Sequence, residues 1–191
     1  LHDLTHRSLL KKARYDYVMT ESKDVRGIDV ALLYNKENIA IDKYYGIRVQ
    51  HEKAEKPTRD ILYALCNTGK GAIHTFVVHA PSRSGGKVAT DSYRMRVAER
   101  LIESLDSIKQ NDENAYIIVA GDFNDYYTDS APQRIVASGM VNVSAGAKGK
   151  NGAKGTYRYR GEWGSLDQIF MSESMLNVCK SLECSIFDAP F

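Results

Sequence analysis

The segment from Asp91 to Ala120 constrains the fold more than any other part of the chain. Within residues 91–110, apolar side chains recur at steps of three and four, which is the spacing of a helix that buries one face. These residues are Val97, Ala98, Leu101, Ile102, Leu105 and Ile108. The run YIIVA at 116–120 is continuously apolar, as a strand covered on both faces should be. A helix followed by such a strand is typical of βαβ units, so we expect a layered α/β fold and not an all-β one.

Composition fits one folded domain without a strong bulk charge. The 191 residues are 43% hydrophobic and 26% charged, close to globular averages, which excludes wholesale disorder. The formal net charge of +2 excludes a protein that binds nucleic acid through bulk charge, so any anion site must be local. No apolar run approaches the roughly 18 residues of a membrane span. We expect a single domain over residues 1–191, and the sequence does not indicate its compartment.

Further strands are predicted on both sides of the helix. The runs ILYALC (61–66) and AIHTFVVH (72–79) flank NTGKG, whose Asn and Gly residues tolerate a tight turn, so they predict a hairpin. Other predicted elements are strands at 28–34, 46–51, 156–160, 165–172 and 182–187, short helices within 1–14 and 131–138, and a basic Gly-rich loop at 146–155.

The sequence Gly121-Asp122-Phe123-Asn124-Asp125 directly follows the buried strand at 116–120. Ligands of layered α/β proteins gather beyond the carboxyl ends of strands, so Asp122 and Asn124 are candidate site residues. A carboxylate and an amide oxygen also suit a hard cation such as Mg²⁺. The ordinary alternative is that Asp and Asn end the strand because their side chains bond the nearby backbone.

His79 ends another predicted strand and is followed by Ala80-Pro81-Ser82-Arg83. A histidine at a strand end can serve as an acid, a base or a phosphate donor, although a lone histidine is more often a polar residue with satisfied hydrogen bonds. Arg83 adds a bidentate anion donor. Arg59 is a weaker candidate, because a surface arginine needs no special explanation.

Asp167 lies within the predicted strand at 165–172. Alternation places it on the same face as Ile169 and Met171, where a carboxylate is costly unless it has a partner. That partner would be an arginine, a histidine or a metal. If the strand is frayed at this point, Asp167 is instead solvated.

Six stretches of the sequence resemble the endonuclease/exonuclease/phosphatase superfamily, which includes deoxyribonuclease I-like nucleases, sphingomyelinases and inositol-polyphosphate phosphatases. They cover most of the chain: RGIDVALLY (26–34), TRDIL (58–62), FVVHAPSRSGG (76–86), YRMRVAERL (93–101), IIVAGDFND (117–125) and GEWGSLDQIFMS (161–172). The resemblance implies a four-layer α+β sandwich in which two packed mixed β-sheets are flanked by helices. It also implies a metal-dependent phosphoesterase of nuclease type that uses Mg²⁺ or Mn²⁺.

The resemblance assigns roles position by position. Asp122 and Asn124 would hold or activate the attacking water, bind the metal and contact the phosphate. His79 would donate a hydrogen bond to the phosphate or act as an acid, and Asp167 would orient the family's general-base histidine. Arg59, Arg83 and Asn124 are the expected phosphate contacts.

Two departures from the family pattern leave a second hypothesis open. The family's metal-ligating Glu belongs before the region where this chain begins, and its terminal Ser-Asp-His is not found among the 191 residues. We expect a chain truncated at both ends, which alone binds metal weakly. The rival hypothesis is a catalytically silent member that binds phosphate or nucleic acid. DNA, RNA, phosphoinositides and small phosphoesters all remain candidate substrates.

Overall fold

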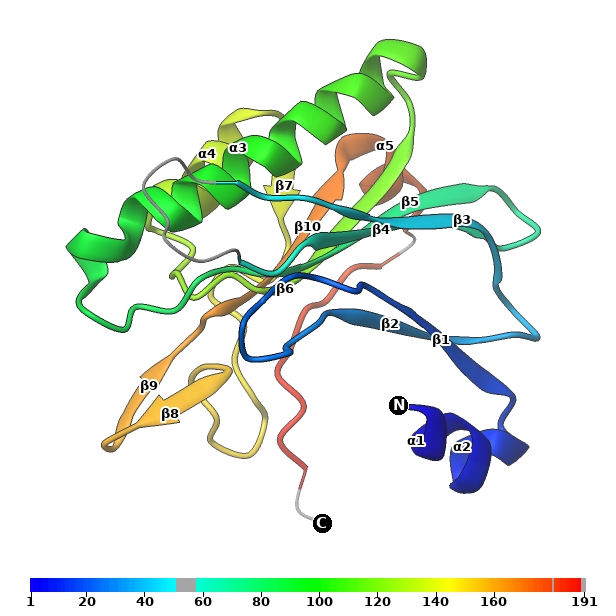
Figure 1. Ribbon diagram of the computed structural model, residues 1–191, viewed down its shortest axis with the longest axis horizontal. Helices are drawn as coiled ribbons and strands as arrows, with labels where there is room; N and C mark the ends of the chain where they lie inside the picture. Colours follow the sequence, from blue (N-terminus) through cyan, green and yellow to red (C-terminus); the bar gives the residue numbers. More distant parts are fainter. Residues whose placement is uncertain (51–57, 180, 190–191) are drawn as a thin grey trace.

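The computed structural model of the chain describes residues 1–50, 58–179 and 181–189. These residues form a six-stranded mixed sheet in the order β3-β4-β5-β6-β10-β7, together with two-stranded sheets β1-β2 and β8-β9 (Figure 1). The strands are β1 (Tyr15–Met19), β2 (Ala31–Asn35), β3 (Ala40–Ile47), β4 (Ile61–Asn67), β5 (Ala72–His79), β6 (Tyr116–Asp122), β7 (Met140–Asn142), β8 (Tyr157–Tyr159), β9 (Glu162–Gly164) and β10 (Asp167–Ser172). The helices are α1 (His2–Arg7), α2 (Leu9–Lys12), α3 (Lys87–Asn111), α4 (Ser130–Ala137) and α5 (Glu173–Val178).

The centre of the main sheet is the unit β5-α3-β6. A parallel pair of strands needs a long crossover, and the 25-residue helix α3 supplies it. β5 and β6 are parallel, with Ile73 opposite Tyr116 at one end and His79 opposite Asp122 at the other. The other pairings within this sheet, β3-β4, β4-β5, β6-β10 and β10-β7, are antiparallel. The carboxyl ends of β5 and β6 therefore meet at one edge.

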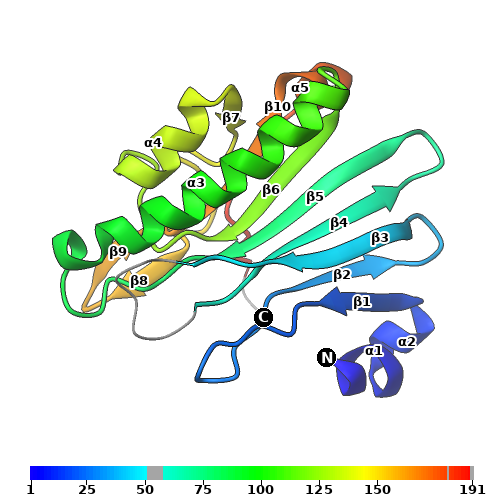
Figure 2. The same cartoon turned by 45° about the horizontal axis from the view of Figure 1, so that its top comes forward.

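Each face of the main sheet carries its own apolar cluster. On one face, Phe76, Val119 and Phe170 pack in a buried cluster with residues of α3 and α4, among them Leu101 and Ile135. On the other face, Leu62, Ala64 and Cys66 of β4 pack with Val18 and Val30, which belong to β1 and to the loop before β2. Figures 1 and 2 show α3 and α4 on one side of the sheet and the β1-β2 ribbon on the other.

The expected α/β sandwich and its long helix are confirmed. α3 covers the predicted range 91–110 and extends it at both ends, and its buried apolar residues include Val97, Leu101 and Leu105. The predicted hairpin of β4 and β5 is antiparallel, as expected. The second sheet is only a two-stranded ribbon among the described residues. Of the helices in that part of the chain, none has the length and apolar character needed to cross a membrane.

Two strand predictions need correction, and the strand β1 was not predicted. The strand predicted at 46–51 overlaps β3 only at Gly46 and Ile47, and His51 lies outside the described residues. β3 was misplaced because it is an edge strand whose side chains are mostly exposed, so it lacks an apolar signal. β1 was not predicted, because its five residues are mostly half buried and form no apolar run or clean alternation. The predicted strand at 182–187 is reduced to one bridge between Ile186 and Gly149, because this segment is largely exposed.

The basic Gly-rich loop at 146–155 is tied to the C-terminal segment by one carboxylate. Asp188 accepts hydrogen bonds from the backbone N–H groups of Lys150, Asn151 and Ala153, at 3.0, 2.8 and 3.0 Å. These bonds hold the pKa of Asp188 below its usual value, the bond from Ala153 being the largest cause. The loop therefore presents its lysines from an anchored backbone.

Gly121 allows β6 to approach β5 closely. Its φ is +144°, and a Cβ built on it would lie 1.9 Å from the backbone oxygen of Val78.

We expect Gly121→Ala to lower the free energy of unfolding by several kcal/mol or to prevent folding, because the overlap is with backbone. Gly146→Ala is the control, since φ there is +75° with nothing within 4 Å of the added Cβ. That change should cost only about 1–2 kcal/mol of backbone strain. Urea denaturation measures the free energy of unfolding of both variants, and equal losses for Gly121→Ala and Gly146→Ala would refute the steric argument.

Candidate active site

Three polar side chains form a row across neighbouring strands at the edge where β5 and β6 end. His79 pairs with Asp122 in the parallel register, and Asp122 pairs with Asp167 in the antiparallel register. Paired residues on adjacent strands point to the same face. Alternating residues such as Val78 and Phe170 face the helices, so the row faces the side that carries the β1-β2 ribbon. Residues up to 88 positions apart in sequence thus share one face of one edge.

The centre of the row is the pair His79 and Asp122. The imidazole Nε2 lies 3.7 Å from a carboxylate oxygen of Asp122, and the side chains are 31% and 35% exposed. The two side chains lie within ion-pair distance when the imidazole is protonated, and they are open enough to meet a substrate. The structure therefore brings these two predicted site residues together.

Asn124 is held against the same pair by two hydrogen bonds. Its backbone N–H donates to Oδ1 of Asp122 at 2.8 Å, and its Nδ2 donates to the carbonyl of Ala80 at 3.0 Å. Its φ is +50°, in the left-handed region that Asn tolerates better than most residues. The amide therefore bridges the loop after β6 to the segment after β5.

Arg59 lies beneath the row and not on its rim. Its guanidinium is buried, and it donates from Nε to the carbonyl of His79 at 2.9 Å and from Nη2 to the carbonyl of Ala80 at 2.7 Å. Its Nη1 donates to Asp24 at 3.3 Å, and both side chains are at most 5% exposed. Each nitrogen of Arg59 thus already has a partner within the protein. The arginine holds the end of β5 in place, and its contact with a phosphate stays a prediction.

Arg83 is likewise engaged by the loop that follows β6. Its Nε donates to the carbonyl of Asn124 at 2.7 Å, and its Nη2 contacts Asp125 at 3.2 Å and Asp129 at 2.6 Å. The side chain is 24% exposed, so part of the guanidinium remains at the surface. Arg83 fixes the position of Asn124, and its own role as an anion donor is untested.

A buried ion pair supports this loop from below. Arg94 of α3 is 1% exposed, and its Nε donates to Asp125 at 2.8 Å. The other guanidinium nitrogens of Arg94 bond Thr90, Asp91 and the carbonyl of Lys87. The second oxygen of Asp125 is buried without a hydrogen-bond partner among the described residues. Arg94 is therefore the main compensation for a buried carboxylate three residues beyond Asp122.

Burial determines the electrostatics of His79. Desolvation lowers the pKa of its imidazole, and the positive charge of Arg59 lowers it further, while Asp122 opposes both. The shift carries the pKa below the usual value for histidine, so the ring is mostly neutral at neutral pH. A neutral imidazole has one N–H to donate and one nitrogen that can accept a proton.

Asp122 shifts in the opposite direction. Burial raises its pKa, the backbone N–H of Asn124 lowers it, and the negative charge of Asp167 raises it again. The net shift is upward, which makes the carboxylate more basic than an ordinary aspartate. Two opposed shifts in adjacent groups are a common feature of catalytic sites.

Asp167 corrects one expectation of the sequence. It was predicted to lie on a buried apolar face, but in β10 the buried positions are Gln168, Phe170 and Ser172, and Asp167 is exposed. The apolar residues Ile169 and Met171 share its face but are only half buried. The burial argument for a partner of Asp167 therefore fails, although its place beside Asp122 stands.

The donor set supports at most part of a metal site. Asp122 and Asn124 offer oxygen atoms of the kind that Mg²⁺ prefers, and Mg²⁺ commonly completes its shell with water and substrate oxygens. Within the described ranges, however, no group of three or more His, Cys, Asp or Glu residues is arranged to hold a metal. These two residues could hold a cation only together with other ligands.

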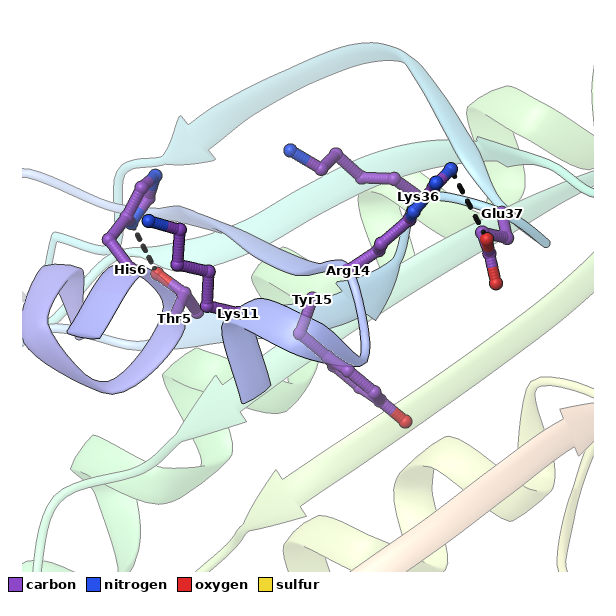
Figure 3. A pocket seen from close by; sticks show the side chains of 7 residues that line it. All are labelled: Thr5, His6, Lys11, Arg14, Tyr15, Lys36 and Glu37. Atoms are coloured by element: carbon purple, nitrogen blue, oxygen red, sulfur yellow. Dashed lines mark hydrogen bonds and ion pairs between the residues drawn. The ribbon is translucent and has the colours of Figure 1, made fainter. Parts of the chain in front are cut away.

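A separate pocket of about 480 Å³ lies at the other end of the β1-β2 ribbon (Figure 3). It is lined by Thr5, His6, Lys11, Arg14, Tyr15, Lys36 and Glu37. Its cations are partly neutralised, since Arg14 pairs with Glu37 at 3.3 Å and Lys36 pairs with Asp16 at 3.2 Å. The row of His79 does not contribute to this pocket.

Sequence reasoning missed the residues that support the site. The carboxylate of Asp24 accepts hydrogen bonds from the guanidinium of Arg59 and from the backbone N–H and side chain of Arg26. These contacts outweigh burial and hold the pKa of Asp24 below its usual value. The one available signal was Arg94, a charged residue that continues the apolar stripe of α3 three positions before Val97. The Asp24 pairing joins residues 35 apart and leaves no local pattern.

The fold is that of deoxyribonuclease I-like proteins, with a mixed sheet, a smaller second sheet and flanking helices. The sequence model of a family described as "Endonuclease/Exonuclease/phosphatase family" matches residues 1–190. The chain belongs to this family. No match was found among curated proteins.

Three solved structures illustrate the similarity. The human Nocturnin catalytic domain with bound sulfate shares 17% identity at a TM-score of 0.65, covering 86% of this chain and 63% of that one. A mannosyl-6-phosphatase of Bacteroides thetaiotaomicron shares 18% sequence identity at a TM-score of 0.59, and the match covers 84% of this chain and 64% of that one. A truncated Caenorhabditis elegans TDP2 shares 15% sequence identity at a TM-score of 0.62, and the match covers 89% of this chain and 66% of that one. The chain thus spans less than two thirds of the length of these structures.

The electrostatics of the His79 and Asp122 pair predict an NMR result. We expect the imidazole of His79 to titrate below about 6.5, the usual histidine value. Asp122→Asn should lower this pKa further, because the Asp122 charge favours the imidazolium. His74, whose pKa is lowered mainly by burial, is the internal control and should not respond to the variant. A pKa of His79 above the usual value, or one unchanged by Asp122→Asn, would contradict the assignment.

The buried pair of Arg94 and Asp125 predicts a difference in stability between two neighbouring arginines. Arg94→Met leaves Asp125 buried with weaker compensation, so we expect a loss of about 3 kcal/mol in the free energy of unfolding. Arg96→Met is the control on the same helix, since its pairs with Glu99 and Glu103 are exposed and should be worth about 1 kcal/mol or less. Urea denaturation measures both, and comparable losses would show that the buried pair has no special weight.

Proposed function

We propose that this protein is a phosphoester hydrolase of nuclease type that depends on a divalent cation. The observation that carries the proposal is the row of His79, Asp122 and Asp167 at the joined ends of β5 and β6, with Asn124 bonded to its centre. Membership in the endonuclease/exonuclease/phosphatase family supports the reaction class. The Nocturnin domain, which has a bound sulfate, and the mannosyl-6-phosphatase share the fold.

His79 would act on the phosphate as a neutral donor. Its pKa is lowered by burial and by Arg59, so at neutral pH it keeps one ring N–H. Hydrogen bonds aimed at the equatorial oxygens stabilise the charge that develops in phosphoryl transfer. Because Arg59 also fixes the carbonyl of His79, the direction of this donor is set before a substrate binds.

Asp122 would orient and activate the attacking water. Its pKa is raised by burial and by Asp167, which makes it a better proton acceptor than a solvated aspartate. The backbone of Asn124 already occupies Oδ1 of Asp122, so Oδ2, the oxygen nearer His79, is the one left for water. The amide of Asn124, fixed through Ala80, would contact the phosphate.

A divalent cation such as Mg²⁺ or Mn²⁺ would supply positive charge to the phosphate oxygens and help the leaving group. Asp122 and Asn124 are the residues of this chain that would contribute to holding it. Such help is expected to be needed, because Arg59 and Arg26, the cations whose charge acts on His79, both pair with Asp24.

Hydrolysis of bis(4-nitrophenyl) phosphate and of 4-nitrophenyl phosphate by the 191-residue chain tests the proposal. With Mg²⁺ or Mn²⁺ in large excess, because this chain alone is expected to bind the metal weakly, we expect turnover that is lost in chelator. Asp122→Asn should lower kcat by about 100-fold or more, because it removes the acceptor for the water proton. Asp106→Asn, an exposed position on α3, is the matched control and should leave kcat unchanged.

Three outcomes would sink the proposal. Wild-type activity that survives in Asp122→Asn would place the chemistry elsewhere. Activity that is indifferent to chelator would exclude the cation. No hydrolysis of either ester, in a folded chain that still binds inorganic phosphate, would identify the catalytically silent phosphate-binding member of the fold.

A further inference from the structure

Exposed aromatic side chains gather on a hairpin next to the row. Strands β8 and β9 are joined by the two residues Arg160 and Gly161, which both have positive φ, +49° and +88°. Such a two-residue turn matches the twist of a hairpin and makes it tight. Figures 1 and 2 show this hairpin projecting from the main sheet beyond the ends of β6 and β10.

One face of the hairpin presents two parallel rings. Tyr157 and Tyr159 alternate along β8, are 47% and 56% exposed, and have ring centroids 6.2 Å apart with planes only 12° from parallel. The guanidinium of Arg160 lies 5.2 Å from the centroid of the Tyr159 ring. Exposed rings that gather in one place keep apolar area in water, which is a feature of interaction sites.

Tyr126 extends this face toward the row. Gly164 pairs with Tyr157, so the two residues present the same face of the hairpin. A Cβ on Gly164 would lie 2.9 Å from the ring of Tyr126, which therefore packs directly on the backbone of β9. The guanidinium of Arg83 covers Tyr126 with its carbon 4.3 Å from the ring centroid. We call Tyr126, Tyr157 and Tyr159 the aromatic face.

The aromatic face is continuous with the candidate active site. Tyr126 follows Asn124 by two residues, and Arg83 contacts both the Tyr126 ring and the carbonyl of Asn124. At the other end, the backbone N–H of Asp167 donates to the hydroxyl of Thr156 at 3.3 Å, and Thr156 directly precedes Tyr157. A ligand bound at the row would therefore extend onto these rings.

The charge around the hairpin favours an anionic ligand. Between residues 148 and 163 the sequence has five cations, namely Lys148, Lys150, Lys154, Arg158 and Arg160, and one acid, Glu162. All six side chains are exposed, and the lysines lie on the loop that Asp188 anchors. The whole chain has a net charge of only +2, so its excess of positive charge is concentrated here.

We propose that the aromatic face binds single-stranded nucleic acid, with its bases stacked on Tyr157 and Tyr159 and its phosphates near Arg160 and the loop lysines. Rings and cations that alternate along a path are the features by which proteins hold single strands. In a duplex the base faces are already stacked on one another and are closed to these rings. This inference rests on the proposed function and names its substrate class.

Binding of a fluorescein-labelled oligothymidylate, measured by anisotropy in chelator so that the strand stays intact, tests the inference. We expect the single strand to bind more tightly than a duplex of equal length. Tyr159→Ala should weaken binding about tenfold, since one stacked base contributes about 1–3 kcal/mol. The matched control is Tyr44→Ala on β3, an equally exposed tyrosine (53%) at the far edge of the main sheet, which should change nothing.

Two further measurements separate stacking from charge and this inference from the proposed function. Polyphosphate should compete for the site with equal strength in wild type and Tyr159→Ala, because it has no bases. Hydrolysis of bis(4-nitrophenyl) phosphate should be unaffected by Tyr44→Ala, because Tyr44 lies outside both the aromatic face and the row. Equal binding by Tyr159→Ala and Tyr44→Ala, or a preference for duplex, overturns the inference. If the strand binds as expected but no ester is hydrolysed, only the proposed function fails.

Discussion

The parallel pairing of β5 with β6 is the constraint on which the rest of this structure depends. It requires α3 as its crossover, and α3 in turn buries the apolar face that stabilises the sheet. The same pairing sets His79 opposite Asp122 at the edge where both strands end. Gly121 lets the strands meet at this point, because any side chain there would overlap the backbone of Val78. The fold and the candidate site thus share one structural cause.

Two buried arginines then hold in place the segments that follow β5 and β6. Arg59 bonds the carbonyls that follow β5, and Arg94 bonds Asp125 in the loop that follows β6. The half-exposed groups His79 and Asp122 therefore lie on a rigid support of compensated charges. Preorganisation of this kind lets donors act on developing charge without a reorganisation cost at the moment of reaction.

Much of this arrangement could be predicted from the sequence, and the exceptions have physical reasons. The long helix, the buried strand β6 and the residues Asp122 and Asn124 leave local patterns, namely periodicity, continuous apolarity and a polar group at a strand end. The edge strand β3 leaves none, because solvent accepts any residue on its exposed faces. The exposure of Asp167 was only one of two alternatives, because alternation identifies the two faces of a strand but not which of them is buried. The ion pair of Arg59 with Asp24 depends on tertiary contact between distant residues.

The central claim is that His79 and Asp122 act as one catalytic unit. A double-variant cycle on kcat/KM for bis(4-nitrophenyl) phosphate, using His79→Gln, Asp122→Asn and the two combined, tests it most directly. Residues that act together show strongly non-additive losses, so the combined variant should be about as slow as the slower single variant. If the two losses instead multiply, the residues act independently, and the account of a joint site at the ends of β5 and β6 is wrong.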